Sequence, residues 1–416
     1  PELHASDQAL IQASRELGRN DRVWRAQVGV YFGEPGKEVP DPYFGGEGPP
    51  RTGCIKCGAC MVGCRYGAKN TLDRNYLYLA EKRGVQVLPE QRVVRIEPLP
   101  GGGYELVLER STGWFHPRRR LRAKNVVLSA GVLGTVPLLM RCKAEGWLPR
   151  LSDQLGDRVR TNSEAFVAVR GGRHGPALGG SGIAISAGID VDEKTHIEAV
   201  RYNAGSDFIG FLTTPLTDGE GGPWRRRWRW LGQFLRRPWR VLGNLIPLGW
   251  GKSSVLLMVM QPIDNYLRLR WGRRPFWPFS RTIRSERATD QPIPTYFPVA
   301  HDIARQMSKN LGAQPQSGSL DVLLNVSTTA HILGGCPMGS SAADGVIDDR
   351  CRVFGYEGLY VIDGSAVPAN LGVNPSLTIT ALAEHAMAQI PALVEQSGSR
   401  ALPAGEPELP PGVTLH

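Results

Sequence analysis

The sequence contains no apolar run long enough to cross a membrane, no recognisable secretory leader and no DNA- or RNA-binding motif. Its net charge of +10 would suit an anionic partner, but the excess arginine is concentrated locally. We therefore predict no nucleic-acid partner. The first residue is Pro rather than Met, so a leader could precede it. Localisation stays open, with a cytoplasmic or membrane-peripheral protein as the expectation.

The sequence also lacks the cysteine pattern of a disulfide-held fold. Of seven cysteines, four are clustered between Cys54 and Cys64, and the other three are scattered through 416 residues. Small secreted proteins held by disulfides show a much denser pattern. The 50 glycines and 32 prolines instead indicate a globular chain rich in loops, and its length favours two domains or two lobes.

Two stretches have the pattern of a nucleotide-binding α/β unit. Residues 124–129 predict a buried strand, Ala130 and Gly131 a tight turn, and residues 132–140 a helix. A small-residue turn between strand and helix lets the backbone approach a dinucleotide. Near the C-terminus, residues 359–362 predict a second buried strand that ends in Asp363-Gly364-Ser365. An acid and bare backbone at that position are typical of a nucleotide site.

A turn and a helix follow this second strand. Gly372-Val373-Asn374-Pro375 predicts the turn, and residues 376–390 predict an amphipathic helix, with Pro375 where the start of a helix tolerates proline. The free N–H groups and the dipole at such a helix start attract an anionic group.

The segment from His331 to Ile390 resembles the C-terminal signature of the glucose–methanol–choline oxidoreductases, most closely the cholesterol-oxidase-like branch. The resemblance rests on AHILGGCPMG from residue 330, GLYVIDGS from 358 and NLGVNPSLTITALAE from 370, in this order. Residues 124–140, and 156–164 with Thr161-Asn162-Ser163-Glu164, resemble the same branch. Ile332 departs from the pattern, because much of the family has proline after the histidine.

This resemblance implies FAD as the cofactor and assigns roles by position. His331 corresponds to the active-site histidine at the reactive edge of the flavin, and Asn374 to its partner. The resemblance also places the parts of the cofactor. Asp363 and Gly364 would lie beside the pyrophosphate and ribityl chain, and Ala130 and Gly131 at the strand–helix turn. The backbone of Val94 would meet the adenine, and Asn374, Pro375 and Thr378 would meet the flavin ring.

The implied reaction is FAD-dependent oxidation of the CH–OH group of an alcohol, with a sterol or another bulky apolar alcohol as the expected substrate. A base must take the hydroxyl proton while a hydride leaves the carbon for the flavin. The imidazole of His331 suits this task near neutral pH, and the amide of Asn374 can hold the same oxygen. Oxygen or a redox protein would accept the electrons.

The expected fold is mixed α/β (α+β): a Rossmann-like FAD-binding domain split in the sequence, with a substrate-binding domain inserted. We assign residues 1–164, including a cysteine-rich loop at 53–67, to the first part of the FAD-binding domain, 165–320 to the substrate-binding domain, 321–395 to the second part and 396–416 to a loose tail. The chain contains no GxGxxG motif. The resemblance therefore implies that this unit precedes residue 1, and we expect these 416 residues alone not to hold FAD stably.

The cysteine cluster leaves three interpretations open. Cys54, Cys57, Cys60 and Cys64 have the spacing of a bacterial ferredoxin run, although Arg65 stands where proline usually follows. An iron–sulfur cluster there would favour an electron-transfer protein, or a dehydrogenase that relays electrons from the flavin, over an oxidase. Four cysteines also suit zinc. The stretch also resembles one in the cholesterol-oxidase-like branch, where the cysteines need not bind a metal.

Residues 223–250 hold five tryptophans and seven arginines. Arginines interleave there with Trp224, Trp228, Phe234, Leu235, Trp239, Leu242 and Leu245, a pattern that would suit contact with an anionic membrane surface. The alternative is a helix that packs its tryptophan face on the protein and leaves the arginines in water. In the same lobe, Glu198 is either a second acid–base group or a solvated or paired strand residue.

Overall fold

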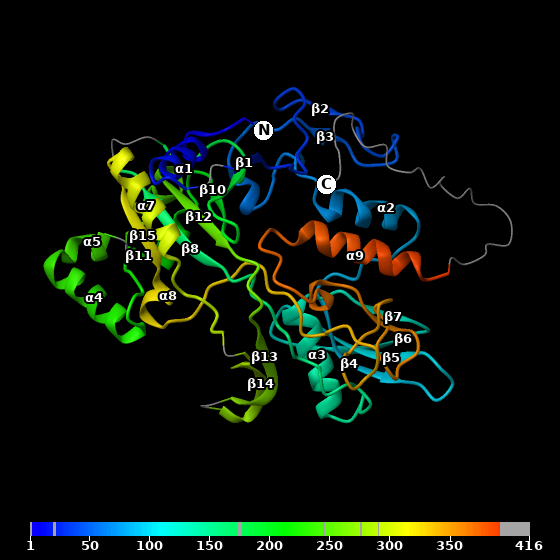
Figure 1. Cartoon of the computed structure of the whole chain (residues 1–416). Coiled ribbons are helices and arrows are strands. Elements are labelled where there is room, and N and C mark those ends of the chain that lie inside the picture. The colour runs from blue at the N-terminus through cyan, green and yellow to red at the C-terminus, as the bar shows by residue number, and fades with distance from the viewer. Residues whose placement is uncertain are drawn as a thin grey trace.

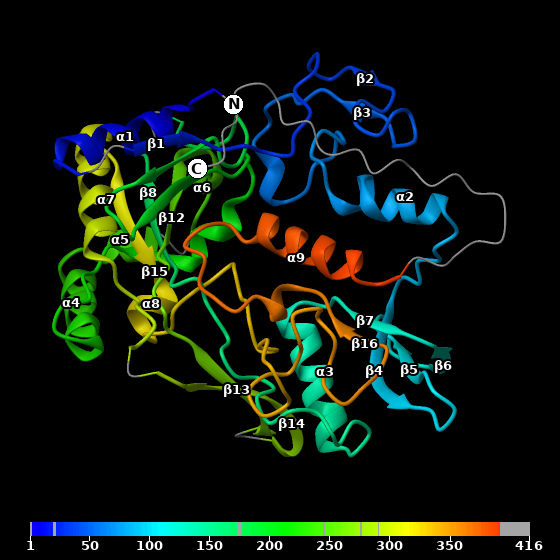
Figure 2. The ribbon, with the colours of Figure 1, turned by 45° about the vertical axis from the view of Figure 1, so that its right-hand side comes forward.

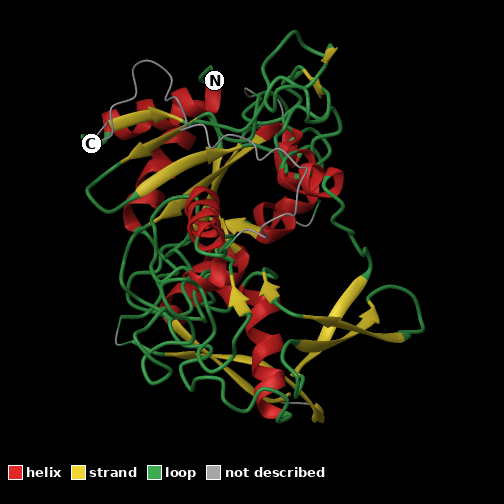
Figure 3. Cartoon of the chain, turned by 90° about the vertical axis from the view of Figure 1, so that its right-hand side faces the viewer, coloured by secondary structure: helices red, strands yellow, loops and turns green. Residues whose placement is uncertain are grey.

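The computed structural model describes residues 2–19, 22–172, 177–243, 246–274, 277–289 and 291–391. Within these ranges the chain forms two lobes connected by long loops (Figures 1 and 3). The amount of loop agrees with the high content of glycine and proline. Leu245 and the predicted tail at 396–416 lie outside the described residues.

The larger lobe is built on a seven-stranded antiparallel sheet in the order β1-β9-β10-β12-β8-β15-β11. These strands are β1 (Arg22–Arg25), β9 (Ala187–Asp190), β10 (His196–Val200), β12 (Ser254–Met260), β8 (Ala165–Arg170), β15 (Gln314–Gly318) and β11 (Thr213–Pro215). Helices α1 (Ala5–Glu16) and α7 (Pro298–Leu311) cover one face of the sheet (Figure 1).

Strand β10 shows how the two faces of this sheet differ. Side chains alternate along a strand, so Ile197 and Ala199 join the core beneath α1 and α7, whereas His196, Glu198 and Val200 point to the opposite face. That opposite face carries a second apolar cluster, which includes Val200. It therefore combines apolar side chains with two titratable ones.

The smaller lobe has a parallel strand pair at its centre. Strand β7 (Val126–Leu128) pairs with β16 (Leu359–Val361), which lies far away in the sequence. Helix α3 (Val132–Ala144) packs against β4 of the sheet β4 (Gln91–Pro98), β5 (Tyr104–Arg110) and β6 (Arg118–Ala123), and one apolar core joins all these elements. Helix α9 (Ser376–Ala388) lies between α2 (Tyr76–Lys82) and α3 (Figure 2).

The other helices are α2 (Tyr76–Lys82), α4 (Pro223–Arg236), α5 (Pro238–Leu242), α6 (Trp250–Ser253) and α8 (Ser319–Leu323). Strands β2 (Glu38–Val39) and β3 (Arg51–Thr52) form one pair, and strands β13 (Leu267–Arg274) and β14 (Trp277–Arg287) form another. Short 3-10 helices span Ala59–Met61, Leu72–Arg74, Asp207–Leu212 and Gly364–Ala366. In the described part of the chain, no helix has both the length and the apolar character needed to span a bilayer.

The mixed α/β class predicted from the sequence is confirmed. In the sequence, β7 and β16 flank six of the seven strands of the larger lobe's sheet, all except β1. Two segments depart from the predicted boundaries. Helix α1 and strand β1, assigned to the FAD-binding part, belong to the seven-stranded lobe, because β1 pairs with β9 and Asp7 of α1 makes a buried ion pair with Arg201 (2.9 Å). Hairpin β13–β14 instead contributes Leu269 to the core of the smaller lobe.

Candidate active site

His331 lies in the loop after α8, and a buried carboxylate holds its imidazole. Nδ1 of His331 is hydrogen-bonded to Oε1 of Glu164, whose side chain is 0% exposed. The other oxygen of Glu164 accepts the N–H of Ala330 at 2.7 Å. Because Nδ1 is engaged, Nε2 is the nitrogen that remains to meet a substrate. The imidazole is only 15% exposed, so a group bound there would be largely shielded from water.

Gly334 locks the His331 loop onto the rest of the site. Its φ is +75°, and a Cβ at this position would lie 2.0 Å from the carbonyl oxygen of Arg158. Its N–H donates to the carbonyl of Gly364 at 2.9 Å. A residue with a Cβ would push the histidine loop away from Arg158. Glycine at this position therefore allows the hydrogen bond that connects the histidine loop to the Asp363-Gly364 turn.

Asn162 connects the two halves of the site. Its Nδ2 donates to Oε1 of Glu164 (3.3 Å) and to the carbonyl of Val373 (3.0 Å), and its Oδ1 accepts the N–H of Gly372 (2.8 Å). Asn162 and Ser163 both have positive φ, 58° and 44°, and both are fully buried. A positive φ is uncommon for residues other than glycine and persists only where the surrounding structure holds the backbone in place. Such residues are concentrated at functional sites.

Asn374 is held by a second buried carboxylate, Glu198 of β10. Nδ2 of Asn374 lies 2.8 Å and 3.0 Å from the two oxygens of Glu198, which is 1% exposed. The amide N–H groups face the carboxylate, so the carbonyl oxygen Oδ1 is the end turned away from it. The interpretation of Glu198 as a solvated residue is therefore wrong: it is buried and paired with a predicted site residue.

Asp363 organises the turn between β7 and α3. One carboxylate oxygen accepts the N–H of Gly131 (2.8 Å), and the other accepts the N–H of Ser365 (2.8 Å). The structure thus brings Ala130, Gly131, Asp363 and Gly364 together at the ends of the two parallel strands, as expected of a nucleotide site.

Several features of this region fit a flavin, whose flat ring needs apolar contact and a positive edge. Val127, Leu133 and Leu377 are 45%, 63% and 81% exposed around the strand ends and the start of α9. Helix α9 begins after Pro375 without a side-chain cap, so the N–H groups of its first turn, at Ser376–Thr378, can face an acceptor. These residues would hold the ring beside Asn374.

Val94 lies in β4 at a bulge, where the strand register shifts between Val93 and Arg95. A bulge leaves one residue out of the ladder, so its backbone groups can meet another partner. Val94 borders a cavity of about 220 Å³ whose other lining side chains include Arg118, Arg120 and Trp147. An aromatic ring and arginines would suit an adenine and its phosphates, and the contact of the Val94 backbone with the adenine stays a prediction.

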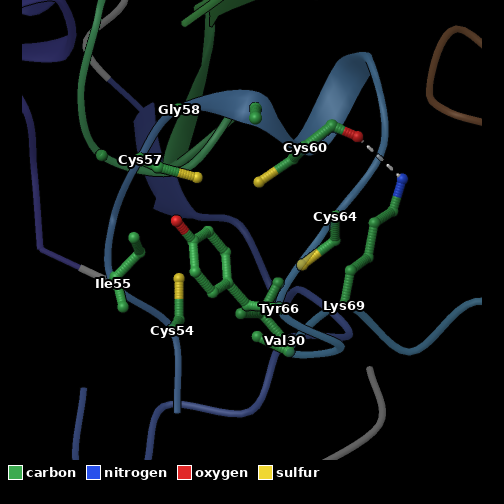
Figure 4. A pocket seen from close by; sticks show the side chains of 12 residues that line it. Val30, Cys54, Ile55, Cys57, Gly58, Cys60, Cys64, Tyr66 and Lys69 are labelled. Atoms are coloured by element: carbon green, nitrogen blue, oxygen red, sulfur yellow. Dashed lines mark hydrogen bonds between the residues drawn. The ribbon is translucent and has the colours of Figure 1, made fainter. Parts of the chain in front are cut away.

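The four clustered cysteines line one pocket (Figure 4). Cys57 and Cys60 point toward each other, and the ring of Tyr66 lies among the sulfur atoms. Burial alone would raise the pKa of Cys64, but the backbone N–H groups of residues 66–69 point at its sulfur and lower this pKa. Over the described ranges, no three His, Cys, Asp or Glu side chains are arranged to hold one metal ion.

Comparison with known proteins identifies the family. Residues 50–146 and 282–383 match the N- and C-terminal parts of the GMC oxidoreductase family. A cholesterol oxidase of Acinetobacter baumannii is 45% identical over 398 residues, which cover 93% of this chain and 70% of that protein. The chain belongs to the GMC oxidoreductase family. It is an FAD-dependent oxidoreductase that acts on CH–OH donors.

Two further relatives and one solved structure are also similar to this chain. A cholesterol oxidase of Mycobacterium tuberculosis is 41% identical, with 98% of this chain and 71% of that protein covered. A long-chain-alcohol oxidase of Arabidopsis thaliana is 44% identical over 355 residues, which span 79% of this chain and 45% of that protein. The solved structure of pyridoxine 4-oxidase from Mesorbium loti has a TM-score of 0.53 at 14% identity and covers 93% of this chain and 70% of its own, which supports the fold alone.

The sequence pointed to His331, Asn374 and Glu198 but not to the pairs that these residues form. Glu164 and Asn162 appeared only as part of a resemblance, although they bond directly to the site. The available signal was the Asn-Ser-Glu run immediately before the apolar strand 165–169, since a carboxylate at the edge of a buried strand needs a partner.

We expect Glu164→Gln to slow alcohol-dependent reduction of the bound flavin by about 10²-fold or more, because the neutral amide no longer stabilises a protonated His331 or fixes its tautomer. Anaerobic stopped-flow absorbance of the flavin measures this rate. Glu193→Gln, the same change at an exposed position, is the matched control. A Glu164→Gln rate equal to that of the control would contradict the assigned role.

Proposed function

We propose that this enzyme oxidises the hydroxyl group of a sterol or another bulky apolar alcohol, with His331 as the base. The observation that carries the proposal is the His331–Glu164 pair, in which a buried carboxylate fixes Nδ1 and leaves Nε2 for the substrate. Relatives named cholesterol oxidase and long-chain-alcohol oxidase support the class of substrate.

The proposed reaction uses two side chains, those of His331 and Asn374. Nε2 of His331 takes the hydroxyl proton, and the negative charge of Glu164 stabilises the imidazolium that results. Oδ1 of Asn374 can accept a hydrogen bond from the hydroxyl group and so orient the carbon. The bound FAD supplies the acceptor for the hydride, so the alcohol becomes a carbonyl compound.

The surroundings of Glu198 favour an apolar substrate. Glu198 lies opposite Met258 in the sheet, and His196 lies opposite Met260. Both methionines are buried on the same face as Val200 and Trp250, with Phe166 packed against them. Flexible methionine side chains adapt to irregular apolar shapes, which suits a bulky hydrocarbon skeleton.

A panel of alcohols tests the proposal. The flavin-loaded holoenzyme is mixed anaerobically with a sterol, a long-chain primary alcohol and a short alcohol, and loss of flavin absorbance is followed. We expect the apolar alcohols to reduce the flavin fastest and His331→Asn to slow reduction by on the order of 10²–10⁴-fold with flavin still bound. Failure of every alcohol to bleach the flavin, or an unaffected variant, would overturn the proposal.

A second candidate is a dehydrogenase that passes electrons onward through an iron–sulfur cluster at Cys54, Cys57, Cys60 and Cys64. Supporting it are the four sulfur atoms around one pocket and the N–H groups aimed at Cys64. A cluster of several irons spaces its thiolates more widely than a single ion does, so the lack of a single-ion arrangement among described residues leaves this candidate open.

The content of iron and acid-labile sulfide in the anaerobically purified holoenzyme distinguishes the two routes for the electrons. One route is relay through an iron–sulfur cluster, and the other is direct oxidation of the flavin by oxygen. The relay requires both elements near the stoichiometry of the cluster, and their loss in Cys57→Ser. Contents near zero, with hydrogen peroxide formed in air, rule out the cluster and assign oxygen as the acceptor.

Membrane contact is supported by helix α4, which turns several large apolar side chains toward solvent. Trp224, Trp228 and Leu235 are 64%, 58% and 71% exposed and lie on one side of the helix, at i, i+4 and i+11. Figure 1 shows α4 and α5 at the outer end of the larger lobe. The interpretation in which the tryptophans pack on the protein is thus wrong for Trp224 and Trp228.

The inward side of α4 carries Arg226 together with the partly buried Trp230 and Phe234. Arg226 is 2% exposed and donates to the carbonyls of Thr217 (3.0 Å), Thr295 (2.8 Å) and Asp321 (3.1 Å). Arg225, Arg229 and Arg236 remain exposed beside the apolar stripe, and the segment 223–242 contains no Asp or Glu. An apolar stripe with a cationic border suits the surface of a bilayer that contains anionic lipid, from which an apolar alcohol could be drawn.

Vesicle co-sedimentation of the holoenzyme measures this contact. We expect binding to phosphatidylcholine vesicles that contain phosphatidylserine, weaker binding at high salt, and loss of about tenfold in Trp224→Ser/Trp228→Ser. Trp114→Ser is the matched control, since Trp114 is 97% exposed on the β5–β6 hairpin. Equal binding of the double variant and the control would contradict the assignment to α4.

A further inference from the structure

Glu198, the carboxylate that holds Asn374, is itself held by a histidine of the same strand. Oε1 of Glu198 lies 3.4 Å from Nε2 of His196. Nδ1 of His196 lies 2.9 Å from Asp190 of β9, whose side chain is 31% exposed. A chain of hydrogen bonds therefore connects the amide of Asn374 with a partly exposed aspartate.

The ring of His196 occupies a closely fitted slot. It stacks on Trp24 of β1, with centroids 4.7 Å apart and planes 15° apart. On β9, Gly188 provides the space, because a Cβ there would lie 2.5 Å from Cε1 of the ring. The imidazole is 6% exposed, so its nitrogens meet carboxylates rather than bulk water. A ring fixed in this way can hold Glu198 in one orientation.

The contacts of His196 favour the imidazolium form. An ionised carboxylate only accepts hydrogen bonds, so both ring nitrogens need a proton to bond both partners. Burial alone would lower the pKa of His196, but the hydrogen bonds and negative charges of Glu198 and Asp190 outweigh burial and raise this pKa. Arg22 of β1 lies 3.9 Å from Asp190. Met260 of β12 faces His196 and carries no charge.

We propose that His196 is a positioning residue that orients Asn374 through Glu198. This inference rests on the proposed function, in which Oδ1 of Asn374 meets the hydroxyl group of the alcohol. The imidazolium stabilises the negative charge of Glu198, and the ionised carboxylate accepts hydrogen bonds from Nδ2 of Asn374, so Oδ1 is turned away from it. A protonated carboxyl group could instead donate to Oδ1 and reverse the amide. His196 acts through these two residues and does not touch the substrate.

The pH dependence of turnover follows from this arrangement. The contact to Glu198 requires the imidazolium, so it is complete below the raised pKa of His196 and is lost as pH rises through that pKa. His331, by contrast, acts as a base only after it has lost its proton. The kcat of the holoenzyme should therefore rise with pH and then fall again, with His196 responsible for the alkaline limb.

Two substitutions of His196 separate hydrogen bonding from packing. His196→Phe fills the same slot against Trp24 without a donor, so kcat should fall by about tenfold or more with little change in KM. His196→Gln keeps an N–H donor and does not titrate, so it should recover most of kcat and lose the alkaline limb. Glu193→Gln, at an exposed position in the turn between β9 and β10, is the control and should keep both.

The thermal midpoint confirms that each variant is folded. If His196→Phe does not fold, Asp190→Asn at its partly exposed position makes the same kinetic test, because it removes the acceptor that holds Nδ1. It should lower kcat and shift the alkaline limb to lower pH.

NMR of the holoenzyme gives a readout that does not depend on turnover. The imidazole of His196 should titrate with a pKa above the ordinary value of about 6.5, and Asp190→Asn should lower it. The side-chain amide signal of Asn374 should shift with the same midpoint, and this shift should disappear in His196→Phe. An Asn374 signal that ignores both the titration and the substitution overturns the proposal.

The outcomes distinguish the positioning role from the function on which it rests. If the wild-type holoenzyme oxidises apolar alcohols and His196→Phe does so equally fast, the positioning role fails and the proposed function stands. An alkaline limb that persists unchanged in His196→Gln also overturns the positioning role. If no alcohol reduces the flavin of the wild-type enzyme, both proposals fail.

Discussion

The site depends on the buried turn from Thr161 to Glu164, whose backbone, amide and carboxylate groups form hydrogen bonds to the loops on both sides. Asn162 bridges Glu164 and the Gly372–Val373 turn, and its own N–H donates to Oδ1 of Asn370 at 2.8 Å. Ser163 donates to Oδ1 of Asn265 at 3.0 Å. A buried polar group without a hydrogen-bond partner destabilises the fold by about 1–3 kcal/mol. Removing one member of this network would therefore leave its partners buried and unpaired, and would lower the stability of the fold.

This turn also explains how two distant lobes produce one site. Residues 162–164 directly precede β8 of the seven-stranded sheet, whereas His331 and Asn374 flank the Asp363 turn of the smaller lobe. Hydrogen bonds from the turn to both loops fix the histidine and the asparagine relative to the ends of β7 and β16. Catalytic geometry therefore rests on long-range pairing and not on either lobe by itself.

Each of the two site residues is paired with its own carboxylate, and the surroundings give the pairs different tasks. Glu164 has no exposed surface, and it is hydrogen-bonded to His331, to the amide of Asn162 and to the N–H of Ala330. Glu198 holds Asn374 and is linked through His196 to an aspartate at the surface. A helix with exposed tryptophans lies at the outer end of the same lobe. The structure thus combines a shielded site with an apolar outer surface.

The sequence by itself determined the family, the cofactor and the reaction type, because His331, Asp363, Asn374 and the turns around them are contiguous motifs in a readable order. It also predicted the strand–turn–helix at 124–140 and the helix after Pro375, since hydrophobic period and turn residues are local signals. Tertiary structure alone decided which carboxylate meets which site residue, because Glu164 and Glu198 are separated from their partners by more than a hundred residues. It likewise decided that α1 and β1 join the sheet of the larger lobe and that Trp224 faces outward, because strand pairing and the buried side of a helix are set by the partner surface.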